Sequence, residues 1–137
     1  MLSSIGVFLL LVIAAVSENF FKEWHGIQAQ AKNQEGAIDT RLRQVVNPNL
    51  KTADRCVTCH IGMAPGEQLT SAQKVAAVHK PVVHNPSEIG CTVCHGGQGL
   101  ATTKEDAHGD VHFWPQPMLP MKNSYAGCGT CHTPHNV

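Results

Sequence analysis

The pentapeptide Cys-x-x-Cys-His occurs three times in this chain, at residues 56–60, 91–95 and 128–132. The three copies contain all six cysteines. The motif is typical of covalent c-type haem attachment, in which two thiols form thioethers with the haem vinyl groups and the histidine binds the iron. The sequence therefore predicts three haem c groups. Their attachment residues are Cys56, Cys59, Cys91, Cys94, Cys128 and Cys131, and the proximal iron ligands are His60, His95 and His132.

Structural zinc and disulfides are the two alternatives for these cysteines. Two Cys-x-x-Cys pairs supply the four thiolates of a tetrahedral zinc site, and an even number of cysteines in an exported domain is typical of disulfides. A zinc site leaves the third pair without a function. Neither alternative explains why a histidine follows every pair, so we favour haem.

The composition limits both the core and the partners of the chain. Its 137 residues suffice for one small domain with an anchor, and only 5% of them are aromatic. Three porphyrins would supply the missing apolar volume, so we expect folding to require haem. The formal net charge is zero, which argues against nucleic acid as a partner because binding to phosphates needs a basic surface.

The N-terminal segment is apolar enough to enter a membrane. Residues 1–17 carry no charged side chain, and about 17 residues is the lower limit for a helix that spans a bilayer. A signal peptide cleaved after Ser17 is the alternative. We favour a retained anchor over residues 1–20, because no basic residue precedes the apolar run and an aromatic and cationic segment follows it.

The sequence predicts a mainly α fold with much irregular loop, organised around three haems. Apolar residues recur at helical spacing between Ile27 and Val46. We therefore expect one long helix over residues 1–46, bent near Gly26, which divides the chain into the anchor at 1–20, a connector helix at 21–47 and a trihaem cytochrome c domain at 48–137. Within the domain we expect a helix over 71–79, short helices at the motifs and an extended segment over 114–120, which contains three prolines.

Six further histidines are available to complete the coordination of the three irons. Haems that only transfer electrons are usually six-coordinate, with His or Met as the second axial ligand. We expect His79, His84 and His108 to be these ligands, with His79 and His84 on the first two haems and His108 on the third. His112 is the reserve, whereas His25 and His135 are not expected to bind iron, and the methionines are expected to pack.

Several segments resemble membrane-anchored multihaem c-type cytochromes. They are Asp-Arg-Cys-Val-Thr-Cys-His at 54–60, His-Asn-Pro at 84–86, Gly-Cys-Thr-Val-Cys-His-Gly-Gly-Gln-Gly at 90–99, Ala-His-Gly at 107–109, and Trp114. Such proteins are associated with bacterial respiratory or photosynthetic electron-transfer complexes. The resemblance covers about residues 18–132 and implies an electron-transfer subunit with bis-histidine haems.

A second resemblance is to membrane-anchored quinol dehydrogenases of the NapC/NrfH kind, in which a methionine closely follows the first motif, as Met63 does here. Those proteins carry at least four haems, so we rank this family second. A quinol-oxidising enzyme also needs a haem open to substrate near the bilayer, with an acid or base such as Asp54, Glu23 or His25 beside it.

We therefore expect an electron carrier rather than an enzyme. The span from Cys56 to His132 is short enough to hold three porphyrins nearly in contact, with an exposed edge at residues 128–132. The expected location is the bacterial cytoplasmic membrane, with a single span and the haem domain on the periplasmic side. The expected partners are subunits of a membrane redox complex and a soluble or extracellular electron carrier.

Overall fold

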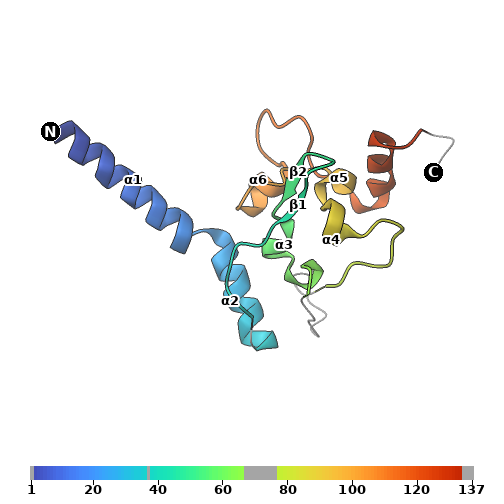
Figure 1. Ribbon diagram of the computed structural model, residues 1–137, viewed down its shortest axis with the longest axis horizontal. Coiled ribbons are helices and arrows are strands. Elements are labelled where there is room, and N and C mark those ends of the chain that lie inside the picture. The colour runs from blue at the N-terminus through green and yellow to red at the C-terminus, as the bar shows by residue number, and fades with distance from the viewer. Residues whose placement is uncertain (1, 37, 67–76, 134–137) are drawn as a thin grey trace.

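The computed structural model describes residues 2–36, 38–66 and 77–133 of the chain. A long N-terminal helix projects from a small domain of short helices, a two-stranded sheet and irregular loops (Figure 1). The predicted fold class, mainly helical with much irregular loop, is confirmed.

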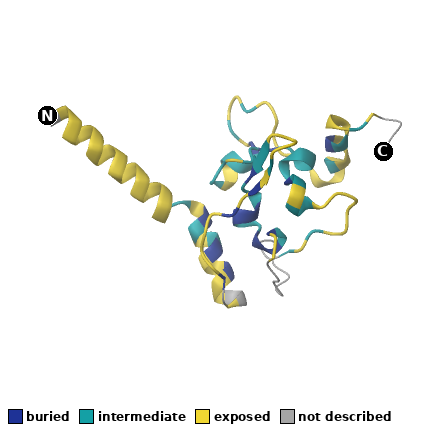
Figure 2. Cartoon of the chain, in the orientation of Figure 1, coloured by how far each residue is buried: buried dark blue, intermediate teal, exposed yellow. Residues whose placement is uncertain are grey.

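The N-terminal helix, α1, spans Leu2–Phe20, and its described residues are exposed along its length (Figure 2). From Ile5 to Phe20, its described large apolar side chains are more than 40% exposed. It begins a stretch that is long and apolar enough to cross a membrane, by length and composition. A signal sequence has the same properties, so the fold alone leaves both uses of α1 open.

The predicted connector helix over 21–47 is too long. A break at Phe21 and Lys22, rather than a bend near Gly26, separates α1 from α2 (Glu23–Glu35). The helix ends at Glu35 because Gly36 adopts a φ of 88°, from which the chain turns back.

The apolar residues that suggested one helical face lie instead on two segments that meet. Ala31 on α2 and Ile38 after the turn form one cluster with Ile61, and this cluster is almost completely buried. Their spacing in the sequence is helical, but the reversal of the chain at Gly36 is what brings them together.

A short antiparallel hairpin occupies the end of the predicted connector. Strand β1 (Val45–Asn47) pairs with β2 (Thr52–Asp54), in a register that places Val45 opposite Asp54. β-Branched Val45 and Val46 favour a strand, and the turn that follows Asn47 reverses the chain. The hairpin thereby brings Asp54 to the start of the first motif.

Short helices carry all three motifs, as predicted. They are α3 (Cys56–Cys59), α5 (Thr92–His95) and the 3₁₀ helix η2 (Met121–Thr130). The remaining short helices are η1 (Ile61–Met63), α4 (Pro86–Ile89) and α6 (Lys104–His108). Residues 114–120 have no regular helix or strand, as their prolines predict. Most of the helix expected over 71–79 lies outside the described residues.

The protein core is small, as the low aromatic content predicts. Besides the cluster at Ile61, a second one contains Val45, Val57 and Ala64, with Met63 packed against it as expected of a packing methionine. Large apolar side chains elsewhere in the domain remain exposed, including Val83, Phe113 and Tyr125. This distribution leaves apolar surface for additional groups to cover.

Candidate haem-binding sites

Six histidine rings of the domain lie in three pairs, and each pair joins a motif histidine to one of the expected second ligands. The ring centroids are 6.5 Å apart for His60 and His108, 6.3 Å for His95 and His79, and 5.8 Å for His132 and His84. Two imidazoles on opposite sides of one metal, each bound at about 2 Å, have centroids about 6 Å apart. All three spacings are therefore suited to an iron between the rings.

The order of the pairs differs from the order expected from the sequence. His108 lies opposite the first motif rather than the third, and His84 lies opposite the third motif rather than the first or second. The expectation that His108 serves the third motif is therefore wrong in this structure. His79 lies opposite the second motif, which is one of the two places expected for it.

The position of His108 follows from the way the chain folds back after the second motif. The backbone N–H of Arg55 donates to the carbonyl of Gly99 at 2.7 Å, which fixes this segment beside the first motif. Helix α6 follows, and the N–H of Lys104 at its start donates to Glu23 of α2 at 2.7 Å. Because α6 ends at His108, these two contacts place that ring against the first motif.

Two features prepare the second pair for metal binding. Nδ1 of His79 lies 2.6 Å from the carbonyl oxygen of Lys80, and an N–H at Nδ1 can donate to it, which leaves Nε2 for a metal. Burial lowers the pKa of His95, and the nearby His79 lowers it further, against a smaller opposing effect of Asp54. A lower pKa favours the neutral imidazole, which is the form that binds metal.

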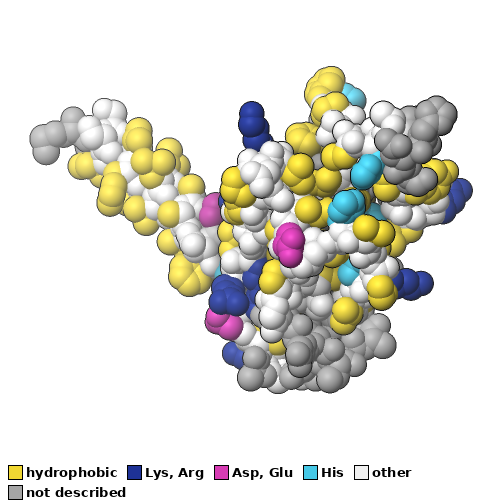
Figure 3. Space-filling model, turned by 45° about the vertical axis from the view of Figure 1, so that its right-hand side comes forward, with side chains coloured by type: hydrophobic (Ala, Val, Ile, Leu, Met, Phe, Trp, Pro, Cys, Tyr) yellow, Lys and Arg dark blue, Asp and Glu magenta, His cyan; other side chains and the backbone are white. Residues whose placement is uncertain are grey.

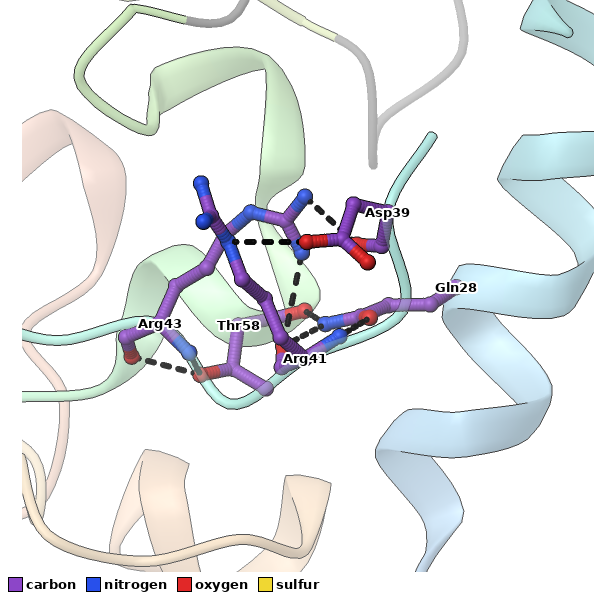
Figure 4. Close-up of polar contacts among 5 residues, drawn as sticks. All are labelled: Gln28, Asp39, Arg41, Arg43 and Thr58. Carbon is purple, nitrogen blue, oxygen red and sulfur yellow. Dashed lines mark hydrogen bonds and ion pairs between the residues drawn. The ribbon is translucent and has the colours of Figure 1, made fainter. Parts of the chain in front are cut away.

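The first motif is fastened to α2 by a buried amide. The side chain of Gln28 is completely buried, and its Nε2 donates to the carbonyls of Arg41 at 2.7 Å and of Thr58 at 2.8 Å. Its Oε1 accepts from the N–H of Arg41 at 2.9 Å (Figure 4). The Thr58 hydroxyl in turn donates to the carbonyl of Arg43 at 2.6 Å. The first site therefore has a defined position relative to the helix that follows α1.

The first and second motifs meet at their leading cysteines. The sulfur atoms of Cys56 and Cys91 and a carboxylate oxygen of Asp54 all lie within 4.8 Å of one another. The hydrogen bond between the two thiols, burial and the charge of Asp54 all raise the pKa of Cys56. Groups attached through these sulfurs would have neighbouring edges.

The second and third motifs also lie in contact. A Cβ on Gly127 would lie 2.7 Å from the carbonyl carbon of Cys94 and 2.9 Å from its Cα, so only glycine allows this approach. Burial is the largest cause that raises the pKa of Cys94, followed by the neighbouring Cys128 and Cys131. The three motifs therefore follow one another in space in the same order as in the sequence.

The proline-containing segment connects two of the sites through its backbone. The N–H of Met118 donates to the carbonyl of His108 at 2.8 Å, and the N–H of Leu119 donates to the carbonyl of His95 at 2.7 Å. A ligand of the first pair and a ligand of the second are thus held by consecutive residues.

The zinc and disulfide alternatives fit this arrangement less well. The six cysteines form no disulfides. In the described part of the chain, the one group of side chains placed to share a metal contains Asp54 and only two cysteines. Burial is also the largest cause that raises the pKa of Cys59, which disfavours the thiolate that zinc needs.

The other histidines lie outside the three pairs. His112 is exposed and contacts the ring of Phe113, and His25 stacks on Trp24 with ring centroids 3.6 Å apart. His135 lies outside the described residues. Figure 3 shows histidine side chains next to hydrophobic ones on one face of the domain.

Asp54 is the functional residue that sequence reasoning misplaced. It was a candidate acid or base beside the bilayer, but it is 1% exposed and its carboxylate accepts hydrogen bonds from the N–H groups of Cys56, Cys91 and Thr92. Its position two residues before Cys56 indicated a contact with the first motif, but nothing in the sequence indicated that the second motif would also lie beside it.

Comparison with known proteins supports the haem interpretation. A family described as cytochrome c554 and c-prime matches residues 15–96, which include the first two motifs and more than half of the chain. No curated protein and no solved structure matches the chain.

Proposed function

The chain belongs to the cytochrome c554 and c-prime family of multihaem c-type cytochromes, and from this we propose that it is a membrane-anchored wire of three bis-histidine haems. Electron transfer through c-type haems is the activity that the family implies. The observation that carries the finer proposal is the set of three histidine pairs at 5.8–6.5 Å. One iron in each pair would be six-coordinate, as in haems that only transfer electrons.

We assign the haems by these pairs. Cys56 and Cys59 would attach the first haem, and His60 and His108 would bind its iron. Cys91 and Cys94 would attach the second, with His95 and His79 on its iron. Cys128 and Cys131 would attach the third, with His132 and His84 on its iron. The support for this assignment is that each pair contains exactly one motif histidine.

Bound haem would supply the one-electron redox step, and the residues of the chain determine where that step takes place. The six cysteines would hold the porphyrins, and the paired histidines would leave no iron open to another ligand. The contacts at Cys56–Cys91 and Cys94–Gly127 would set the spacing between the sites. The result is a linear order from first to third.

The contacts of α2 indicate which of the three sites lies nearest to α1. Gln28 and Glu23 on α2 hold the first motif and the helix that carries His108. The third motif, on η2, lies on the side of the domain away from α1 (Figure 1). We therefore propose that the first haem exchanges electrons with a membrane complex and the third with a periplasmic or extracellular carrier.

We further propose that α1 is retained as a single membrane span, with the domain on the periplasmic side. Its uniformly exposed apolar surface needs a lipid or protein environment if it stays attached. The segment that follows it is already part of the domain, because Trp24, Gln28 and Ala31 on α2 are buried. The domain would therefore sit directly at the membrane surface.

The same geometry favours a carrier over a quinol-oxidising enzyme. An enzyme would need an iron with an open position, whereas each motif histidine is matched by a second ring. Of the candidate proton acceptors, Asp54 is the one buried beside the motifs, and its oxygens already accept from three backbone N–H groups.

Purification from membranes in mild detergent tests the proposal. We expect the intact mass of the full chain plus three haems, and an electron paramagnetic resonance spectrum in which all iron is low-spin. Two haems, or a high-spin signal from one third or more of the iron, would overturn it.

A further inference from the structure

Asp54 is a buried carboxylate at the junction of the first two motifs. Residue Asp54 is 1% exposed, and its two oxygens accept from the N–H of Cys56 at 3.0 Å, of Cys91 at 2.8 Å and of Thr92 at 2.7 Å. One side chain therefore holds the start of both attachment helices.

The negative charge of Asp54 is held in place by these donors. Burial by itself disfavours the charged form, but the three backbone N–H donors favour the carboxylate. These donors are backbone groups, so they remain when the cysteine sulfur atoms carry haem. Among the described residues, no lysine or arginine forms an ion pair with it. A full negative charge therefore lies within 4.8 Å of the sulfur atoms of Cys56 and Cys91.

Such a charge acts unequally on the two oxidation states of an iron nearby. The ferric state carries one more positive charge than the ferrous state, so an anion stabilises it and lowers the reduction potential. The effect is large where water is excluded, as it is around this carboxylate. In the described part of the chain, the hydrogen bonds of Asp54 go to the first two motifs and none goes to the third.

We propose that Asp54 is a shared positioning residue that joins the first two haems and holds both of their potentials down relative to the third. The inference rests on the proposed function, because it requires haems at Cys56–Cys59 and Cys91–Cys94. The resulting difference in reduction potential would favour electron transfer from the first two haems to the third.

The test is a redox titration of the haem-loaded full chain, at pH 7, with Asp54→Asn. The amide oxygen can still accept from Cys91 and Thr92, whereas the amide NH2 would face the N–H of Cys56, so the bond to Cys56 and the charge are lost and two donors oppose each other there. We expect two of the three midpoint potentials to rise and the third to stay unchanged. Unchanged potentials in a variant that carries three low-spin haems would overturn the inference.

Two control variants separate charge from packing. Asp39→Asn removes a carboxylate whose side chain is 74% exposed, and we expect no selective rise of two potentials. Gly90→Ala keeps the charge but adds a Cβ 3.0 Å from the Cβ of Asp54, at a backbone φ of 85°. We expect it to lower stability without raising the two potentials. An equal rise in Gly90→Ala would show a merely structural role.

A structure of the haem-loaded wild type gives a second, independent test should Asp54→Asn fail to accumulate. We expect the Asp54 carboxylate to contact both thioether junctions, and a carboxylate turned away from them would overturn the inference. Failure of the proposed function would be seen differently, as a wild type without three low-spin haems.

Discussion

The ring of His108 lies 6.5 Å from the ring of His60, although a complete second motif separates the two residues in the sequence. The return of the chain to the first motif uses the contacts Arg55–Gly99 and Glu23–Lys104. The first site therefore combines residues from both sides of the second, so the sites cannot be separate units along the chain.

Replacing His108 should affect one haem only, and it should be the first. In His108→Ala we expect one third of the iron to become high-spin, because one of the three irons loses its second axial ligand. Electron paramagnetic resonance measures the fraction. The matched control is His112→Ala, since His112 is exposed and outside the pairs. A low-spin spectrum unchanged in His108→Ala would exclude His108 as a ligand.

Replacing Gln28 should loosen the first site from the membrane-proximal helix. Gln28→Ala removes three hydrogen bonds and leaves the carbonyls of Arg41 and Thr58 without the amide donor. We expect a loss of about 2–4 kcal/mol in the free energy of unfolding, measured by denaturant titration in detergent. Exposed Gln30 on the same helix is the control, and Gln30→Ala should change it by less than about 0.5 kcal/mol. Equal effects of the two variants would refute this role.

Adding one methyl group at Gly127 should separate the second and third motifs. In Gly127→Ala the new Cβ would meet the backbone of Cys94, which cannot move aside as a flexible side chain can. We expect a cost of about 1–3 kcal/mol or more, together with incomplete attachment of the third haem, seen in the intact mass. Gly129→Ala is the control, because its Cβ would meet nothing within 4 Å. Full occupancy in Gly127→Ala would contradict the close contact.

A charge in the middle of α1 should release the protein from membranes. A lysine at the centre of a spanning helix costs about 2.5–3.5 kcal/mol, so Leu10→Lys should reduce the carbonate-resistant membrane fraction. Asn19→Lys, near the end of the helix, should change it little. A mature protein that begins at Glu18 would show instead that α1 is a cleaved signal peptide.

Some elements were predictable because their signal is local. The motif helices depend on a few consecutive residues, and the lack of regular structure over 114–120 follows from its prolines. The prediction of a helix over 21–47 was wrong. Apolar residues at helical spacing can also lie on two separate segments of one cluster, as Ala31 and Ile38 do in the cluster with Ile61.

By itself, the sequence determined which residues can attach and bind haem, since the type and spacing of the cysteines and histidines identify the attachment motif. It also determined that the N-terminal helix is apolar along its length. Only the tertiary structure decided which second histidine faces which motif, and that Asp54 lies between two of them. The reason is that axial ligands and buried carboxylates act across space, and the distance between them depends on how loops close rather than on their separation along the chain.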